Sequence, residues 1–458
     1  MKQAKHFLAL IAVALFTTNA WAQMTFTYST TATESTLPDG SILVQLPAST
    51  NLNGGFITGV KVGGQTVSLD AITPKPSTTF ITEGEIETFV YDGKAYSFRF
   101  LAGEYFTMVI FSDPHVDTED IKKNVSTKTT AIAAMGTASG KKFTFSKAPS
   151  WYVPKADIVF CLGDMDEDKE KDASSPGQYY KDATAAFNNA KIPFITLYGN
   201  HDLAPDYYDG DNGDAGLTWG INDGGSYFND QSIAIVKNHI TQAKTNGISD
   251  VETFKDSDLK CNVQIEPFAF LFKGVRFYVG HTYWFHKPYD KPGMFSSTTY
   301  YAADGVVTAL SDYVEHHKTE PSIWLQHYPF TSEYNSDNDA SARWWLDQSN
   351  AGRCIAPKDA SSSQYYNNGS VPSYKTSEGV ALATKKKKTL ADIIVKTKNP
   401  VHFSGHSHRN DIIDYTASDN KTSFTDYTIK PFTEGSDNAY IVLCKEGVGV
   451  VEVQRVTF

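Results

Sequence analysis

Leu197-Tyr-Gly-Asn-His-Asp202 follows the apolar run Ile192-Pro-Phe-Ile-Thr196, which has the length and composition of a buried strand. Gly199 lets the backbone turn tightly where that strand ends. An amide, an imidazole and a carboxylate then stand in consecutive positions. An Asn oxygen can bind a metal ion, a His can transfer a proton, and an Asp can orient that His. The stretch predicts a chemical site at a strand end, provided that partner groups exist elsewhere in the chain.

Four other predicted strands end in clusters of the same kind of polar side chain. The clusters are Asp113-Pro-His115, Gly163-Asp164, Gln326-His327 and Gly405-His-Ser-His408. Loops at strand ends of an α/β sheet converge in one crevice. We therefore expect one site that gathers seven candidate metal ligands, namely Asp113, His115, Asp164, Asn200, His327, His406 and His408. Any one of these clusters is weak evidence, whereas the ordered set is specific.

Seven ligands are too many for one tetrahedral ion, but they fit two ions that share a carboxylate. Two divalent ions, two aspartates and a bridging hydroxide leave a small positive charge, which suits an anionic phosphate ester. Two ions about 3.5–4 Å apart can bind phosphate oxygens and stabilise an in-line displacement. His201 would protonate the leaving alkoxide. Carboxylate, amide and imidazole ligands accept Mn, Fe, Zn or Co, so the identity of the ions stays open.

The rest of the chain predicts a two-part organisation. Residues 23–100 show short alternating runs and turn signals, which indicate a small all-β accessory domain. Strands alternate with helices from about residue 101 to 458, and helical spacing favours helices near 127–135, 178–190, 231–245, 306–317 and 390–395. Insertions at about 203–262 and 331–378, the second with Trp344-Trp345, are either binding loops or surface decoration.

The N-terminus and the charge balance limit the possible roles. Lys2 and Lys5 precede the apolar run Phe7–Phe16, and Asn19-Ala-Trp-Ala22 fits a cleavage site, so residues 1–22 are predicted to be a signal peptide. We expect a periplasmic or secreted protein without a transmembrane anchor. The net charge of -11 argues against nucleic acid as a partner. The oligomeric state cannot be read from the sequence.

The four cysteines fall into two pairs of different character. Cys161 and Cys444 lie in apolar runs and are interpreted as small core side chains on strands. Cys261 and Cys354 lie in loop-like stretches and can pair in an oxidising compartment. Sequence alone leaves that pairing open.

The order D-x-H, G-D, G-N-H-D, H, G-H-x-H resembles the calcineurin-like metallophosphoesterases over roughly residues 105 to 458. The resemblance implies an α/β fold with two mixed β-sheets packed face to face and flanked by helices. It implies that Asp164 bridges two ions, that His201 is the proton donor and that Asp202 orients His201. One ion would take Asp113, His115, Asp164 and His408, and the other Asp164, Asn200, His327 and His406.

Two departures bear on the branch of the family. Glu167 stands where purple acid phosphatases carry a Tyr ligand. Asp117 extends the first motif to D-x-H-x-D, as in the acid-sphingomyelinase-like branch, but that branch usually carries Glu at the position of Asp202. We expect an exported enzyme that cleaves phosphate mono- or diesters, small molecules or lipid head groups, by in-line attack of a metal-bridging hydroxide. The alternatives are a sphingomyelinase-like phosphodiesterase and an inactive binding protein on the same fold.

Overall fold

The structure is a computed structural model that describes most of the chain. The described residues are 23–53, 55–165, 177–197, 199, 202, 230–254, 267–280, 304–327, 393–406, 408, 410–416 and 423–458. Several expectations fall outside them: the signal peptide, Asn200 and His201, Cys261 and Cys354, the Trp pair, and most of the two insertions. The helices of the described part include none long and apolar enough to cross a bilayer.

The chain divides into two compact units, Met1–Glu104 with Pro149–Tyr152, and Tyr105–Ala148 with Val153–Phe458. The first unit contains two small sheets and a short 3-10 helix, η1 (Leu69–Ala71). One sheet is antiparallel, with the order β1 (Met24–Tyr28), β4 (Ile57–Val62), β5 (Gln65–Val67). The other has the order β2 (Thr33–Thr36), β3 (Ile42–Leu46), β7 (Lys94–Ala102), β6 (Glu87–Tyr91).

An aromatic core holds the first unit together. Phe26 lies with its ring centroid 4.7 Å from that of Phe98 and 5.2 Å from that of Phe89. Phe89, Phe98 and Phe100 are fully buried. Rings that meet at an edge or a tilt bury large areas and attract one another electrostatically. The predicted small all-β unit is therefore present, with its own hydrophobic core.

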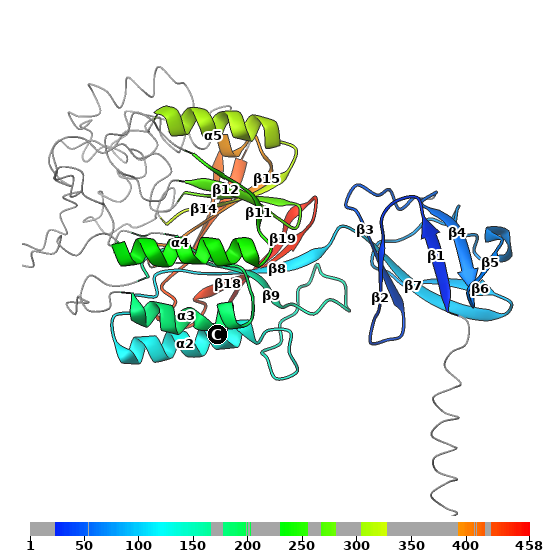
Figure 1. Cartoon of the computed structure of the whole chain (residues 1–458), viewed down its shortest axis with the longest axis horizontal. Helices are drawn as coiled ribbons and strands as arrows, with labels where there is room; N and C mark the ends of the chain where they lie inside the picture. The colour runs from blue at the N-terminus through cyan, green and yellow to red at the C-terminus, as the bar shows by residue number, and fades with distance from the viewer. Residues whose placement is uncertain are drawn as a thin grey trace, which may run out of the picture. The chain divides into compact units, whose positions relative to one another are not determined.

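Two mixed sheets form the second unit (Figure 1). The five-stranded sheet has the order β10 (Phe194–Thr196), β9 (Ala156–Cys161), β8 (Tyr105–Phe111), β18 (Ala439–Lys445), β19 (Gly449–Val456). The seven-stranded sheet has the order β11 (Ser249–Thr253), β12 (Phe268–Phe272), β13 (Val275–Val279), β14 (Pro321–Leu325), β15 (Lys398–Ser404), β17 (Ser423–Thr428), β16 (Asp411–Thr416). Each sheet combines parallel with antiparallel neighbours.

The two sheets pack face to face through large apolar side chains. Phe160 of β9 meets Phe277 of β13, with 5.4 Å between ring centroids. Along β8, Met108 and Ile110 belong to this inter-sheet core, whereas Phe111 lies against the helical side, 6.4 Å from the ring of Phe187. Both faces of the strand are covered, which explains why β8 is a continuous apolar run rather than an alternating one.

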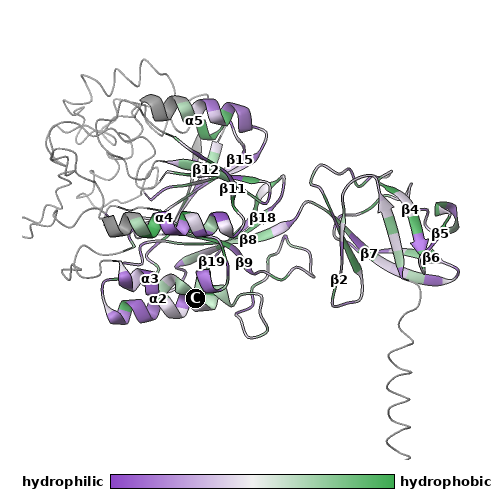
Figure 2. Cartoon of the chain, viewed as in Figure 1, coloured by the Kyte–Doolittle hydropathy of each residue, from purple (hydrophilic) through white to green (hydrophobic). Residues whose placement is uncertain are grey.

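Helices cover the outer faces of the two sheets of the second unit. The described helices of this unit are α2 (Glu119–Ala133), α3 (Gln178–Asn189), α4 (Asp230–Thr245) and α5 (Asp304–His317). Phe187 of α3 packs against Phe194 of β10, and Tyr313 of α5 packs against Tyr278 of β13, so the helices flank opposite sheets. Figure 2 shows hydrophilic and hydrophobic residues alternating along α2 and α4, as expected for helices with one buried face.

The predicted fold class, two mixed sheets flanked by helices, is confirmed. One local prediction is corrected. The helix expected near 127–135 begins at Glu119, where Thr118 caps it by accepting from the Ile121 amide. Within the stretch 203–262, the helix expected near 231–245 is α4, and the structure adds a strand that was not expected, β11, which pairs with β12.

Candidate metal centre

Each predicted polar cluster follows the carboxyl end of a strand. Asp113 follows β8, Asp164 follows β9, and Asp202 follows β10 in the five-stranded sheet. The loops after β14 and β15 of the seven-stranded sheet carry His327, His406 and His408. Strands β8, β9 and β10 are parallel to one another, as are β13, β14 and β15. Within each sheet these loops therefore start at the same end of the strands. The fold thus brings distant parts of the sequence to one place.

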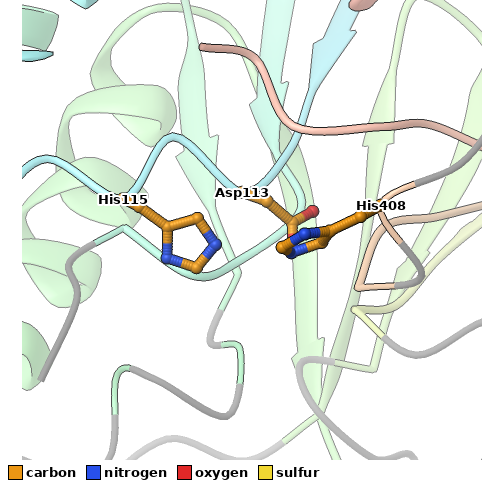
Figure 3. A group of neighbouring side chains, drawn as sticks. All are labelled: Asp113, His115 and His408. Atoms are coloured by element: carbon orange, nitrogen blue, oxygen red, sulfur yellow. The ribbon is translucent and has the colours of Figure 1, made fainter. Parts of the chain in front are cut away.

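The described candidate ligands form two adjacent groups. Asp113, His115 and His408 make the first group, and Asp164, His327 and His406 make the second. In each group the ligand atoms lie within 4.8 Å of one another. Figure 3 shows Asp113 and His115 on one loop, with His408 reaching the Asp113 carboxylate from a separate segment. The structure brings together six of the seven expected ligands, and the seventh, Asn200, lies outside the described residues.

Asp164 connects the two groups. Its Oδ2 atom is 3.2 Å from His327 Nε2 in its own group and 3.9 Å from His115 Nε2 in the other. In the first group, His408 Nε2 lies 3.6 Å from Asp113 Oδ1. Two nearly buried carboxylates beside four imidazoles form a donor set that suits divalent or trivalent ions. The residues present therefore fit the metal ions that the motifs predict.

Burial and neighbouring charges shift the pKa values of the candidate ligands in the absence of metal ions. Burial disfavours charge on Asp113, but the hydrogen bond from His408 and the charge of His327 hold the pKa of Asp113 below its usual range. Burial also opposes the charged form of His327, yet Asp164 raises the pKa of this His to about 9. Burial, with His327 nearby, lowers the pKa of His406 to about 3. At neutral pH Asp113 is therefore ionised and His406 is neutral, which are the forms in which both residues bind a metal ion.

His327 is held in one orientation. Its Nδ1 atom donates to the carbonyl oxygen of Leu162 at 2.8 Å, because a carbonyl can only accept. The Nε2 atom is then the nitrogen that remains for a metal ion, which is the usual arrangement of a ligating His. The side chain is 0% exposed, so no solvent competes for this bond.

Three glycines allow the loops to approach one another. A Cβ atom on Gly199 would lie 2.0 Å from Asp164 Oδ1 and 2.4 Å from the Asp164 nitrogen. A Cβ on Gly405 would lie 1.9 Å from Ser112 Oγ, and one on Gly163 would lie 2.7 Å from His327 Nδ1. Such separations are too short for any side chain. The glycines of the motifs are required because backbone and ligand side chains meet here.

Five of the candidate ligands have left-handed backbone conformations. Asp113, His115 and Asp164 have φ of 50°, 42° and 52°, and His406 and His408 have φ of 63° and 56°. Positive φ is uncommon outside glycine, although Asp, Asn and His adopt it more readily than most residues. Such strained conformations cluster at functional sites. The sequence gives no direct signal of them.

Main-chain hydrogen bonds fix the loops to one another. The Asp113 amide donates to the Gly163 oxygen, and the His115 amide donates to the Asp164 oxygen, each at 3.1 Å. The Gly405 amide donates to the His327 oxygen at 2.8 Å. The ligand geometry is therefore set by backbone contacts as well as by the sheets.

Asp202 has a set of partners that sequence reasoning missed. Its Oδ2 atom accepts from the amides of Gly199 at 2.7 Å and Asp164 at 2.9 Å, and its Oδ1 atom accepts from the Met165 amide at 2.8 Å. The residue is 1% exposed. Burial and the charge of Asp164 raise the pKa of Asp202 to about 7, against the effect of these amides. The contact expected with His201 lies outside the described residues.

Comparison with known proteins gives one family. The sequence model of the calcineurin-like phosphoesterases matches residues 106–410, about two thirds of the chain. No curated protein matches the sequence.

Among solved structures, the chain is similar to a dimetal phosphatase from Danio rerio (10% identity, 77% of this chain and 99% of that chain, TM-score 0.37). It is also similar to a purple acid phosphatase isolated from seeds of yellow lupin, Lupinus luteus (12% identity, 96% and 70%, TM-score 0.31). A third structure is the anchor in the inner membrane complex of Plasmodium (11% identity, 77% and 89%, TM-score 0.27). Similarity at this level says nothing about substrate, so the assignment rests on the family match.

Proposed function

The chain belongs to the calcineurin-like phosphoesterase family and is a metal-dependent hydrolase of phosphate esters, and from that premise we propose that it is an exported enzyme with two metal ions. The observation that carries the proposal is the position of Asp164 between the two ligand groups, within 3.9 Å of His115 and 3.2 Å of His327. A carboxylate in this position suits a bridge between two ions. Asn200 would complete the second group.

The ions would contribute what side chains cannot. When bound, a pair of divalent or trivalent ions such as Mn, Fe or Zn supplies Lewis acidity toward phosphate oxygens and a nucleophile at neutral pH. The protein's part is to hold the ions and admit the ester. His408 is 44% exposed, whereas His327 is 0% exposed, so the first group lies nearer to solvent than the second. We infer that the substrate enters from the side of His408.

His201 is proposed as the general acid. An alkoxide leaving group needs a proton when the P–O bond breaks, and an imidazole next to a metal ligand is suited to give it. The substrate would be a phosphate mono- or diester, either a small molecule or a lipid head group. Export rests on residues 1–22, whose pattern is that of a cleaved signal peptide. Sequencing of the mature N-terminus from the native host should then find Gln23.

The deciding experiment combines metal analysis with a substrate panel. The purified protein should contain two ions per chain, or take them up from added Mn²⁺ or Zn²⁺, and should hydrolyse aryl phosphate esters. Monoesters, diesters and phosphocholine esters in one panel distinguish a monoesterase from a sphingomyelinase-like diesterase. A protein that binds neither ion and cleaves none of these esters would be a binding protein on this fold, and the proposal would be wrong.

The role of His201 has its own test. His201→Ala should keep both ions but slow the hydrolysis of esters with poor leaving groups much more than that of esters with good ones. Equal slowing across the panel would show that His201 does not supply the proton.

A further inference from the structure

Asp202 joins two of the loops that carry metal ligands. The Gly199 amide belongs to the loop after β10, and the amides of Asp164 and Met165 belong to the loop after β9. A single buried carboxylate accepts from all three, at 2.7 to 2.9 Å. The bonds are to main-chain groups, so they fix where the backbone runs.

We propose that Asp202 is a positioning residue that fastens the loop after β9 to the loop after β10 and thereby sets the place of Asp164, instead of acting through His201. This inference rests on the proposed two-metal function, in which Asp164 serves both ions. It assigns to the last residue of the G-N-H-D motif a role in building the metal site.

The surroundings of Asp164 show why such a fastening is needed. Its backbone is left-handed, with φ of 52°, a conformation that is held only where neighbouring structure enforces it. On one side its amide donates to Asp202, and on the other its carbonyl oxygen accepts from the His115 amide at 3.1 Å. Met165 repeats the arrangement, because its amide donates to Asp202 and its carbonyl accepts from the Val116 amide at 3.0 Å.

The segment 163–165 is thus held between two partners, the loop after β8 and the Asp202 carboxylate. Without Asp202, the amides of Asp164 and Met165 would lose this acceptor while their residues stay buried. The segment could then relax toward an ordinary backbone conformation, which would turn the Asp164 side chain away from both ligand groups. Loss of Asp202 should therefore affect both ions, and it should do so before any chemistry takes place.

A carboxylate is the side chain that fits this position. In its ionised form it only accepts hydrogen bonds, and its two oxygens offer about four lone-pair sites for three amides. The amide of an Asn would turn an N–H₂ group toward main-chain N–H donors. Asp202→Asn is therefore a nearly isosteric change that leaves at least one buried amide without an acceptor.

The first measurement is amide hydrogen exchange in the metal-free protein, where bound ions cannot protect the loops. In Asp202→Asn the amides of Asp164, Met165 and Gly199 should exchange at least tenfold faster than in the unmodified protein. Mn²⁺ titration should show at least a tenfold loss of affinity at both sites. With Mn²⁺ at saturation, hydrolysis of esters with good and poor leaving groups should fall by a common factor.

Asp157→Asn is the matched control. Asp157 lies at the opposite end of β9, its side chain is 6% exposed, and its Oδ2 atom accepts from the Thr107 amide at 2.9 Å. The control also replaces a mostly buried carboxylate that accepts a main-chain amide, but it lies far from the motif loops along the strand. It should keep both the exchange protection of Asp164 and the affinity for Mn²⁺.

The proposal is overturned if Asp202→Asn retains slow exchange and Mn²⁺ affinity and slows only esters with poor leaving groups, because that result assigns Asp202 to His201. If Asp202→Asn does not fold, amide exchange in the unmodified protein tests the proposal. Exchange of the three amides as fast as that of exposed loop amides contradicts it, and strong protection of the three amides supports it. Failure to hydrolyse any ester would refute the proposed function while leaving the exchange experiment intact.

Discussion

His239 should make the stability of the second unit depend on pH, and the size of the effect follows from its surroundings. The side chain lies on α4, is 6% exposed, and has its Nδ1 atom 3.0 Å from the Thr196 hydroxyl on β10. Its ring centroid is 4.6 Å from that of Phe194. Burial among these groups lowers the pKa of His239 from 6.5 to about 3. The imidazole is therefore mostly neutral in the folded protein at pH values well above 3.

The direction of the effect follows from proton binding. Between pH 6.5 and 3 the unfolded chain protonates this His and the folded chain does not, so falling pH favours unfolding. The stabilising contribution of neutral His239 is complete above pH 6.5 and is lost as the pH falls toward 3. One pKa unit corresponds to about 1.4 kcal/mol, so the loss between pH 7 and pH 4.5 should be about 2.5 kcal/mol. That is a large part of the free energy of unfolding of an ordinary domain.

His239→Asn tests this directly, because Asn does not titrate. The variant should be less stable at pH 7, where the smaller side chain packs less well, but the difference from the unmodified protein should shrink by about 2.5 kcal/mol at pH 4.5. Urea unfolding of the metal-free protein, followed by tryptophan fluorescence, measures both values. If His239→Asn shows the pH dependence of the unmodified protein, His239 is not held neutral by burial.

Three further results are expected. Gly405→Ala places a Cβ atom 1.9 Å from Ser112 Oγ and 2.7 Å from Asp113 Oδ2, so Mn²⁺ affinity should fall at least tenfold; an unchanged titration would contradict this. Asp164→Asn should lower the metal content at both sites, whereas His408→Asn should lower it at one, as metal analysis of the two variants would show. Phe277→Ala removes a fully buried ring that stacks on Phe270 at 4.9 Å and should lower the free energy of unfolding in urea by about 3–5 kcal/mol; a loss below 1 kcal/mol would mean that the inter-sheet core repacks.

The sequence predicts which of the described side chains gather at the strand ends, but not how the loops that carry them are held. Asp113, Asp164 and His327 each follow an apolar run, and a polar group at a strand end can be recognised without a structure. The structure shows a cap that was not predicted, because Thr118 caps α2 just before Glu119 and Asp120. Apolar spacing predicts a start near Thr127, which is too late, because the residues from Glu119 to Ser126 are mostly polar.

Other features depend on contacts between distant residues and leave no local pattern. β12 is an aromatic run and its antiparallel partner β11 is mostly polar, so no shared alternation marks the pair. The hydrogen bond between His239 and Thr196 joins residues 43 positions apart. Asp202 was interpreted as a partner of its neighbour His201, whereas its described partners include the amides of Asp164 and Met165, 38 and 37 positions earlier in the chain.

The left-handed backbone at Asp113, His115, Asp164, His406 and His408 has a consequence for how this site can change by mutation. Aspartate and histidine are metal ligands, and they are also among the residues that accept positive φ most readily. Asparagine shares both properties, so exchanges among these three are compatible with the backbone, although they change the donor atom, the charge and the reach of the side chain. A β-branched residue would meet two penalties at once, one in coordination and one in main-chain geometry. The residue types at these five positions therefore suit the left-handed backbone as well as the metal ions. A substitution that removes a ligand is best replaced by another of these three residue types.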